Sequence, residues 1–398
     1  MTNRALLSLF SMIALSYAGC GSSSGRGGPV TDGGASLDAA APVTDAGGSG
    51  ADAHVATDAG TAPPAPAACA SPTVGAPVTV ATVSTTALAL ARAPSGLAVV
   101  WSETDGTSAR VALQRLDESG ALSGTQTDIA MFSSFVSQVT VATDGATYVA
   151  CAAGGTPGML RCGAAPVASG SAVDGVTLAG ATPALAYGSA AFLLAYTASG
   201  STQLVSLDDT AHTTGATTVV GGAGSGPPAL VATRVGYAVA FVDGSGAALY
   251  RLAADGTTSG GRIALGPGRA GAWIALATSG ELVGAVWTVS GGDVQAAVVD
   301  ATDAVTPAVT IGPGAMSYGR VSIAGGDASF AVAWSDFGGN IDYRALSAAG
   351  MALGMPTQVP SSWDDNANAI AAVSGGFLLA MTESSSSSPA TVRLLACP

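Results

Sequence analysis

Seven related segments recur at nearly constant intervals along the chain. Each is an apolar run that ends in one large residue, as GLAVVW does at Trp101 and SFAVAW at Trp334. The end residues are, in order, Trp101, Cys151, Tyr196, Phe241, Trp287, Trp334 and Met381, and their spacings are 50, 45, 45, 46, 47 and 47 residues. A fixed period of this length is the sequence signature of a repeat architecture, so the chain is expected to fold as seven copies of one unit.

Each copy predicts four short strands. The stretch AVAFVDGSGAALYRL at 238–252, for example, predicts an apolar strand, a polar hairpin and a third strand, with PALVAT before it and RIAL after it. Four strands in about 45 residues are typical of a β-propeller blade, whereas tandem immunoglobulin-like domains have a period of about 100 residues. The second strands lack alternation because neighbouring blades would cover both faces. We therefore predict an all-β fold over residues 69–398, a seven-bladed β-propeller of four-stranded antiparallel blades.

The two ends of the repeat region predict how the ring closes. The last copy stops at TVRLLACP, directly after its third strand, so its fourth strand is missing there. The segment PVTVATV at 77–83 precedes the first complete copy and has no blade of its own. We predict that this segment supplies the fourth strand of the last blade.

The charge balance argues against one class of partner. The 398 residues include 26 acids and 13 basic residues, all of them arginine, which gives a net charge of -13. A surface of this sign repels a polyanion, so no nucleic-acid partner is expected.

The first 19 residues have the layout of a signal peptide. Arg4 precedes an apolar run that is too short for a comfortable membrane span, and small residues follow the run. Ala18, Gly19 and Cys20 resemble the bacterial lipobox, which implies cleavage before Cys20 and lipidation of its thiol. The residue after Cys20 is Gly21 and not Asp, and in this the chain resembles lipoproteins that are sorted to the outer membrane. The resemblance implies a lipoprotein of the cell envelope, periplasmic or at the cell surface; a secreted protein is the alternative.

The segment after Cys20 predicts a disordered tether over residues 20–68. From residue 21 to residue 68 it contains no aromatic residue and consists mainly of Gly, Ala, Ser, Asp, Pro and Thr. Such a composition has too little apolar bulk to offset the entropy of ordering the chain. The whole layout resembles bacterial lipoproteins that carry a low-complexity spacer before a propeller-like repeat domain.

Five cysteines fit one lipidated and four paired residues. Cys151 and Cys162 flank the hairpin CAAGGTPGMLRC, in equivalent places on two neighbouring strands. Cys69 lies just before the closing strand, and Cys397 ends the strand that it should join. We predict the disulfides Cys151–Cys162 and Cys69–Cys397, with four free buried thiols as the alternative.

Four copies carry an acid two residues after the end residue of the second strand. These acids are Glu103, Asp243, Asp336 and Glu383. In a propeller they would share a face with the connections between blades, and a ring of carboxylates could bind cations or the hydroxyls of a sugar. The alternative, which the pattern favours, is that each acid caps its own hairpin.

One connection between blades, VPSSWDDNANA, combines Trp363, Asp364 and Asp365. An exposed Trp beside two carboxylates could stack on a sugar or bind a metal ion, and packing of the Trp over a capped turn is the alternative. The loops SYGR at 317–320 and MFSSF at 131–135 add aromatic residues to the same face.

Basic and aromatic residues also recur on the third strands. Arg161, Arg251 and Arg344 are expected to pair with acids or carbonyls of adjacent strands, with anion binding as the alternative. Tyr250 and Tyr343, which precede two of them, are expected to lie across from Asp243 and Asp336.

No catalytic, cofactor or metal motif emerges from the sequence. GPGRAG at 266–271 fits G-x-G-x-x-G, but a strand follows it where a nucleotide site needs a helix. We therefore expect an envelope lipoprotein whose propeller is a binding or scaffolding module for a protein or a glycan. Two alternatives stay open: an extracellular propeller enzyme, a glycosidase or lyase with paired carboxylates, and a structural envelope protein.

Overall fold

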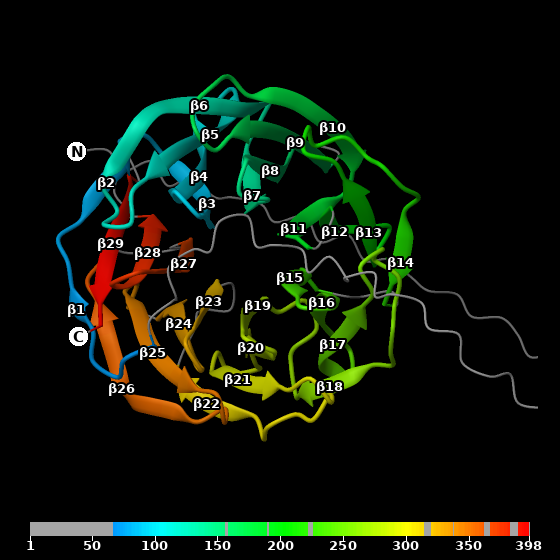
Figure 1. Ribbon diagram of the computed structural model, residues 1–398, viewed down its shortest axis with the longest axis vertical. Helices are drawn as coiled ribbons and strands as arrows, with labels where there is room; N and C mark the ends of the chain where they lie inside the picture. Colours follow the sequence, from blue (N-terminus) through cyan, green and yellow to red (C-terminus); the bar gives the residue numbers. More distant parts are fainter. Residues whose placement is uncertain are drawn as a thin grey trace, which may run out of the picture. The chain divides into compact units, whose positions relative to one another are not determined.

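Seven antiparallel sheets surround a common axis (Figure 1). The computed structural model describes residues 67–397, apart from 156–157, 189–190, 222–225, 314–319, 337, 362–366 and 383–388. All named elements in these ranges are strands. The predicted all-β fold with seven four-stranded blades is confirmed. In the described ranges, no helix has the length and apolar character needed to cross a bilayer.

The first three blades, each from the axis outward, follow the chain order without a crossover. They consist of β3 (Thr85–Ala93), β4 (Gly96–Thr104), β5 (Ala109–Leu116) and β6 (Leu122–Phe132); β7 (Val136–Thr143), β8 (Thr147–Gly154), β9 (Met159–Pro166) and β10 (Val173–Ala179); and β11 (Ala181–Tyr187), β12 (Phe192–Ala198), β13 (Ser201–Leu207) and β14 (Thr218–Val220).

Blades 4, 5 and 6 repeat the same order. They consist of β15 (Ala229–Thr233), β16 (Gly236–Asp243), β17 (Gly246–Leu252) and β18 (Ile263–Gly266); β19 (Ile274–Ser279), β20 (Leu282–Thr288), β21 (Val294–Val299) and β22 (Val309–Gly312); and β23 (Val321–Gly326), β24 (Ser329–Ser335), β25 (Ile341–Ser347) and β26 (Ala352–Val359).

Blade 7 combines both ends of the chain. Its inner strands are β27 (Asn368–Val373), β28 (Gly376–Thr382) and β29 (Ala390–Ala396), and its outer edge is shared by β1 (Thr73–Val74) and β2 (Val78–Ala81). Val78 pairs with Val392 and Thr73 with Ala396. The predicted closing segment therefore occupies its expected place, and β1 extends the same edge beyond the prediction.

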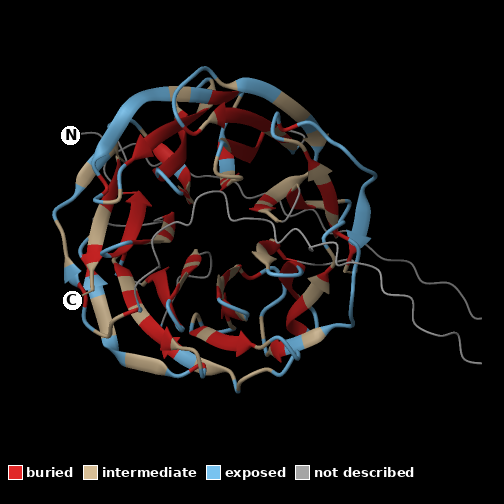
Figure 2. Cartoon of the chain, in the orientation of Figure 1, coloured by how far each residue is buried: buried red, intermediate tan, exposed pale blue. Residues whose placement is uncertain are grey.

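The core is divided among the gaps between blades. Each of the seven predicted end residues lies on the second strand of a blade and is buried. The buried apolar side chains form seven clusters, and each cluster joins two neighbouring blades, including blades 7 and 1. Figure 2 shows this burial concentrated in the middle strands of the blades and exposure along the outermost ones. The second strands are apolar at successive positions, without alternation, because neighbouring blades bury both of their faces.

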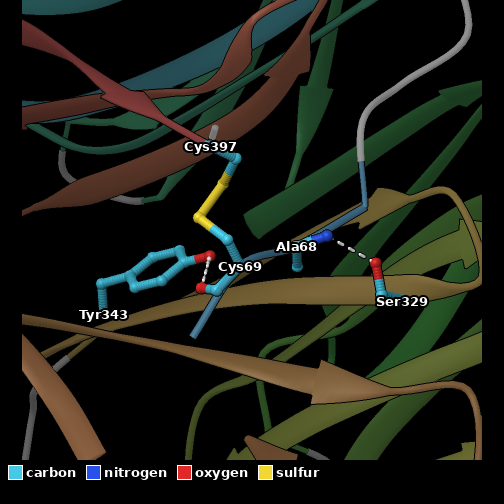
Figure 3. The surroundings of a disulfide bond; sticks show 5 residues. All are labelled: Ala68, Cys69, Ser329, Tyr343 and Cys397. Atoms are coloured by element: carbon cyan, nitrogen blue, oxygen red, sulfur yellow. Dashed lines mark hydrogen bonds between the residues drawn. A yellow bond between two sulfur atoms is a disulfide. The ribbon is translucent and has the colours of Figure 1, made fainter. Parts of the chain in front are cut away.

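A disulfide and two hydrogen bonds hold the closing segment (Figure 3). Cys69 is bonded to Cys397, 328 residues away in sequence. The Ala68 N–H donates to Ser329 Oγ at 2.6 Å, and the Tyr343 hydroxyl donates to the Cys69 carbonyl at 3.1 Å. The chain before β1 is therefore bound to blade 6 as well as to blade 7.

The second predicted disulfide is also confirmed. Cys151 and Cys162 face each other across β8 and β9 and are bonded, with 4.0 Å between their Cα atoms. They lie in the cluster between blades 2 and 3, so this bridge cross-links a hairpin inside the core.

Arginines of the third strands pair with acids or carbonyls, as the sequence predicted, and the pairs also connect neighbouring blades. Arg251 of blade 4 forms an ion pair with Asp303 of blade 5 at 3.1 Å. Arg344 of blade 6 donates to the carbonyl of Ile311 in blade 5 at 2.7 Å. Arg161 of blade 2 donates to the carbonyl of Met131 in blade 1 at 2.7 Å.

The predicted signal peptide at 1–19, Cys20 and the predicted tether up to residue 66 lie outside the described residues. Their assignment stays a prediction.

Candidate functional site

One face of the ring carries the ends of the second strands and the beginnings of the innermost strands. In blade 4, Ala229 at the start of β15 pairs with Ala240 near the end of β16. The hairpins between second and third strands and the connections between blades therefore lie on this face, which we call the connection face. The hairpins between first and second strands lie on the opposite face.

Glu103 stands at the connection face but is held within blade 1. It is buried, with 8% of its surface exposed. Its Oε1 accepts a hydrogen bond from Trp101 Nε1 at 2.8 Å, and its Oε2 accepts one from Arg110 Nε. The contact with Glu103 raises the pKa of the Arg110 guanidinium. Both oxygens are thus engaged by side chains of the same blade.

Asp243 and Asp336 each cap the hairpin that follows their strand. Asp243 Oδ1 accepts from the Ser245 N–H at 2.7 Å and from the Ser245 hydroxyl at 2.6 Å, and Arg262 lies at 3.5 Å. Burial acts to raise the pKa of Asp243, but these hydrogen bonds and Arg262 lower it overall. Asp336 Oδ1 accepts from the Asn340 N–H at 2.8 Å. The described geometry of both residues is that of hairpin capping.

The other predicted ligand residues, Glu383, Trp363, Asp364 and Asp365, lie outside the described residues. A carboxylate ring or a Trp–Asp patch on the connection face stays a prediction. Within the described ranges, no three His, Cys, Asp or Glu side chains are grouped so that they could hold a metal ion.

An axial cavity of about 200 Å³ opens among the seven innermost strands. Its wall is formed by residues just before, or within the first five positions of, each of these strands, so it lies toward the connection face. Leu88, Val139, Leu185, Leu230, Leu276 and Val321 are among the apolar residues of the wall. The polar side chains of the wall are Gln138, Thr140, Arg320 and Asn368.

Among the described residues of this wall, Arg320 carries the charge. Its guanidinium carbon lies 5.1 Å from the centroid of the Trp273 ring, in cation–π contact. Its Nη2 donates to the carbonyl of Ser137 in blade 2, across the cavity from blade 6. The surrounding walls desolvate the group, and this lowers the pKa of the guanidinium to about 10. The side chain stays protonated at neutral pH.

The other polar side chains of the cavity are mostly engaged with the protein. Thr140 Oγ1 accepts from the Leu185 N–H at 3.2 Å. Asn368 accepts from the Ser322 hydroxyl at 2.5 Å and donates to the Arg320 carbonyl at 3.0 Å. Gln138 donates to the Pro183 carbonyl at 3.2 Å, but its Oε1 has no hydrogen-bond partner in the described structure.

Sequence reasoning missed the cavity as a site, although one signal was present. Trp273 and Arg320 occupy the same place in consecutive repeats, since each precedes the end residue of its second strand, Trp287 or Trp334, by 14 positions. The same repeat position carries Ala in blades 1 and 7. The large side chains of Trp273 and Arg320 at this position would have indicated a function at the axis.

Comparison with known proteins shows the fold. No protein-family model matches the chain, and no curated protein matches it. The chain is similar to BP39L lectin from Burkholderia pseudomallei, with a TM-score of 0.57, 16% identity, and coverage of 78% of this chain and 97% of the lectin. It is also similar to a chain of a mitotic checkpoint complex, with a TM-score of 0.55, 14% identity, and coverage of 83% and 97%.

A third similar structure is the WD40 domain of coronin from Toxoplasma gondii. Here the TM-score is 0.53 and the identity 9%, over 85% of this chain and 89% of that domain. At such low identities, the three similarities establish the propeller fold alone.

Proposed function

We propose that this protein is an envelope lipoprotein, anchored through Cys20, whose propeller binds a protein or a glycan with its connection face. The observation that carries the proposal is the axial cavity, to which all seven innermost strands contribute and which contains the cation Arg320. Concave sites with a few placed polar groups are where proteins bind ligands. The cavity makes the connection face the favoured binding surface.

Two further observations support binding over chemistry. The described carboxylates Glu103, Asp243 and Asp336 are engaged within their own blades by hydrogen bonds or ion pairs. In addition, a lectin and a component of a mitotic checkpoint complex, by their names, belong to binding and assembly functions, and both share this fold.

The binding proposal is tested with the full chain and two bulky substitutions. Ser137 is exposed beside the cavity, and Val235 is 82% exposed in a hairpin of the opposite face. Ser137→Trp is expected to abolish binding on a glycan array and in affinity capture from the native envelope, while Val235→Trp leaves binding unchanged. Equal binding by both variants would contradict the assignment of the face.

The anchor is tested separately. Cys20→Ser, or globomycin treatment of cells that carry the native sequence, is expected to block lipidation and to release the mature chain from the membrane fraction. Retention of the Cys20→Ser chain in that fraction would exclude anchoring through this residue.

A further inference from the structure

Arg320 combines few protein partners with a place in the wall of the axial cavity. Arg161 also makes one hydrogen bond and one cation–π contact, but it lies on β9 and does not line the cavity. Five of the others form ion pairs, namely Arg92, Arg110, Arg234, Arg251 and Arg262. Arg115 and Arg344 lack a described acid but each make three hydrogen bonds with the protein. Arg320 makes one, to the Ser137 carbonyl, and no described carboxylate lies within ion-pairing distance.

The guanidinium is nevertheless held in place. The Trp273 ring lies against one face of it, and the Ser137 carbonyl accepts from Nη2. A guanidinium has five N–H groups, so several remain for a ligand. A positioned, partly desolvated guanidinium with free donors is the group that proteins use to bind carboxylates in a two-point contact.

The rest of the wall limits what can accompany a carboxylate. Among the described polar side-chain atoms of the wall, Thr140 Oγ1 and both amide atoms of Asn368 already have partners, whereas the buried Gln138 Oε1 has none. A sugar acid would leave several hydroxyls without side-chain partners. The C-terminal end of a peptide needs fewer polar partners than a sugar acid. Besides the cation, it needs one acceptor for its last amide N–H and apolar walls for its last side chain. Leu185, Leu230 and Val321 provide such walls.

The size of the cavity agrees with one terminal residue. Its volume of about 200 Å³ lies below the roughly 300 to 1,000 Å³ of pockets that enclose drug-sized ligands. The remainder of a partner chain would continue outward over the connection face.

We infer that the axial cavity binds the C-terminal carboxylate of a partner protein whose last residue is apolar, with Arg320 as the carboxylate-binding residue. This inference rests on the proposed binding function and narrows it to a protein partner. Trp273 and Ser137 are positioning residues, because they hold the guanidinium and need not contact the partner.

Calorimetric titration of the full chain tests the inference with short peptides. The probes are acetyl-Gly-Gly-Leu, acetyl-Gly-Gly-Val and acetyl-Gly-Gly-Phe, each with a free C-terminal carboxylate and each again as the amide. At least one free acid is expected to bind, and its amide is expected to bind at least about tenfold more weakly. Glucuronate is titrated in parallel.

Two variants separate the role of Arg320 from a loss of fold. Arg320→Gln is expected to lower the affinity of the free acid about tenfold or more while the melting temperature is retained. Arg234→Gln, which removes an exposed cation on the opposite face, is expected to leave the affinity unchanged. Weaker binding at high salt is expected as well, since ionic strength screens the pair.

Several results would overturn the inference. They are equal binding of acid and amide, no binding by any of the three acids, binding of glucuronate in place of the peptides, or unchanged affinity of Arg320→Gln. If Ser137→Trp still abolishes capture of the native ligand in those cases, the proposed function stands and the inference alone fails.

Discussion

At the scale of single residues, sequence patterns located the acids but could not supply their partners. The repeat placed Glu103, Asp243 and Asp336 at the ends of second strands, and the structure agrees. Whether a carboxylate is free depends on side-chain geometry in the folded hairpin. Arg110 reaches Glu103 because β4 and β5 pair the two residues, and Trp101 reaches it because it lies two positions earlier on the same strand.

Removal of the Glu103 carboxylate is expected to destabilise the protein. Glu103→Ala leaves Trp101 Nε1 and Arg110 without their partner and should lower the free energy of unfolding by about 2 kcal/mol. Glu103→Gln keeps an acceptor for Trp101 and should lose about half as much. Urea unfolding of both variants measures this, and no loss for Glu103→Ala would indicate that the carboxylate is available to a ligand.

Asp342 is expected to make stability fall as pH rises. Burial, together with the nearby Asp336, raises the pKa of Asp342 to about 6. Between pH 4 and pH 6 the folded state therefore holds a proton that the unfolded chain has released, so stability decreases across this window. At pH 7.5, Asp342→Asn should raise the free energy of unfolding by about 1 to 2 kcal/mol.

Asp255 is expected to make stability fall as pH decreases, which is the opposite of the effect of Asp342. Hydrogen bonds from the Thr257 hydroxyl and N–H lower the pKa of Asp255. The contribution of Asp255 to stability is present above the ordinary Asp pKa and is lost as pH falls through the lowered value.

Denaturant unfolding of Asp342→Asn at pH 4.5 and pH 7.5 measures the effect of Asp342. The expectation fails if the free energy of unfolding differs from that of the native chain by the same amount at both pH values.

At the scale of strands, the period predicted the blades, but hairpin length decided the register. Tyr250 was expected across from Asp243 and Tyr343 across from Asp336; both predictions are wrong. Tyr250 pairs with Val239 and Tyr343 with Ala333. The tight hairpin pairs Asp243 with Gly246, so a residue seven positions after Asp243 lies opposite an earlier part of β16.

Glycine at the start of a second strand is expected to be required. Gly236 has a φ of +156°, and a Cβ there would lie 2.2 Å from the Leu252 carbonyl oxygen. Gly236→Ala should therefore destabilise the protein by about 1 to 3 kcal/mol. Gly244, at the other end of β16, has no atom within 4 Å of an added Cβ, so Gly244→Ala should be nearly neutral. Equal effects in thermal unfolding would contradict this account of β16.

At the scale of the whole molecule, closure of the ring brings together residues that are distant in sequence. Arg320 and Ser137 are 183 positions apart and meet across the axis. Periodicity predicted a ring and its closing strand, since both depend on counting strands. It could not predict the axial cavity, because the cavity depends on which side chains seven separate strands direct to one point.

The closing disulfide is expected to stabilise the ring more than the hairpin disulfide. In the chain-entropy model, the 328-residue separation of Cys69 and Cys397 corresponds to about 6 kcal/mol, against about 3 kcal/mol for Cys151 and Cys162. Paired Ser substitutions of each bridge, compared by calorimetry, measure the two contributions. A larger loss for the hairpin bridge would contradict closure as the main role of Cys69.

Site-specific photo-crosslinking in the native envelope tests most directly that the connection face is the binding face. Phe135, 57% exposed on a connection between blades, and Val235, 82% exposed on the opposite face, are replaced in turn by benzoylphenylalanine in the full chain. A discrete crosslinked partner is expected from position 135, its formation is expected to be abolished by Ser137→Trp, and no partner is expected from position 235. A partner crosslinked from position 235 alone would contradict it.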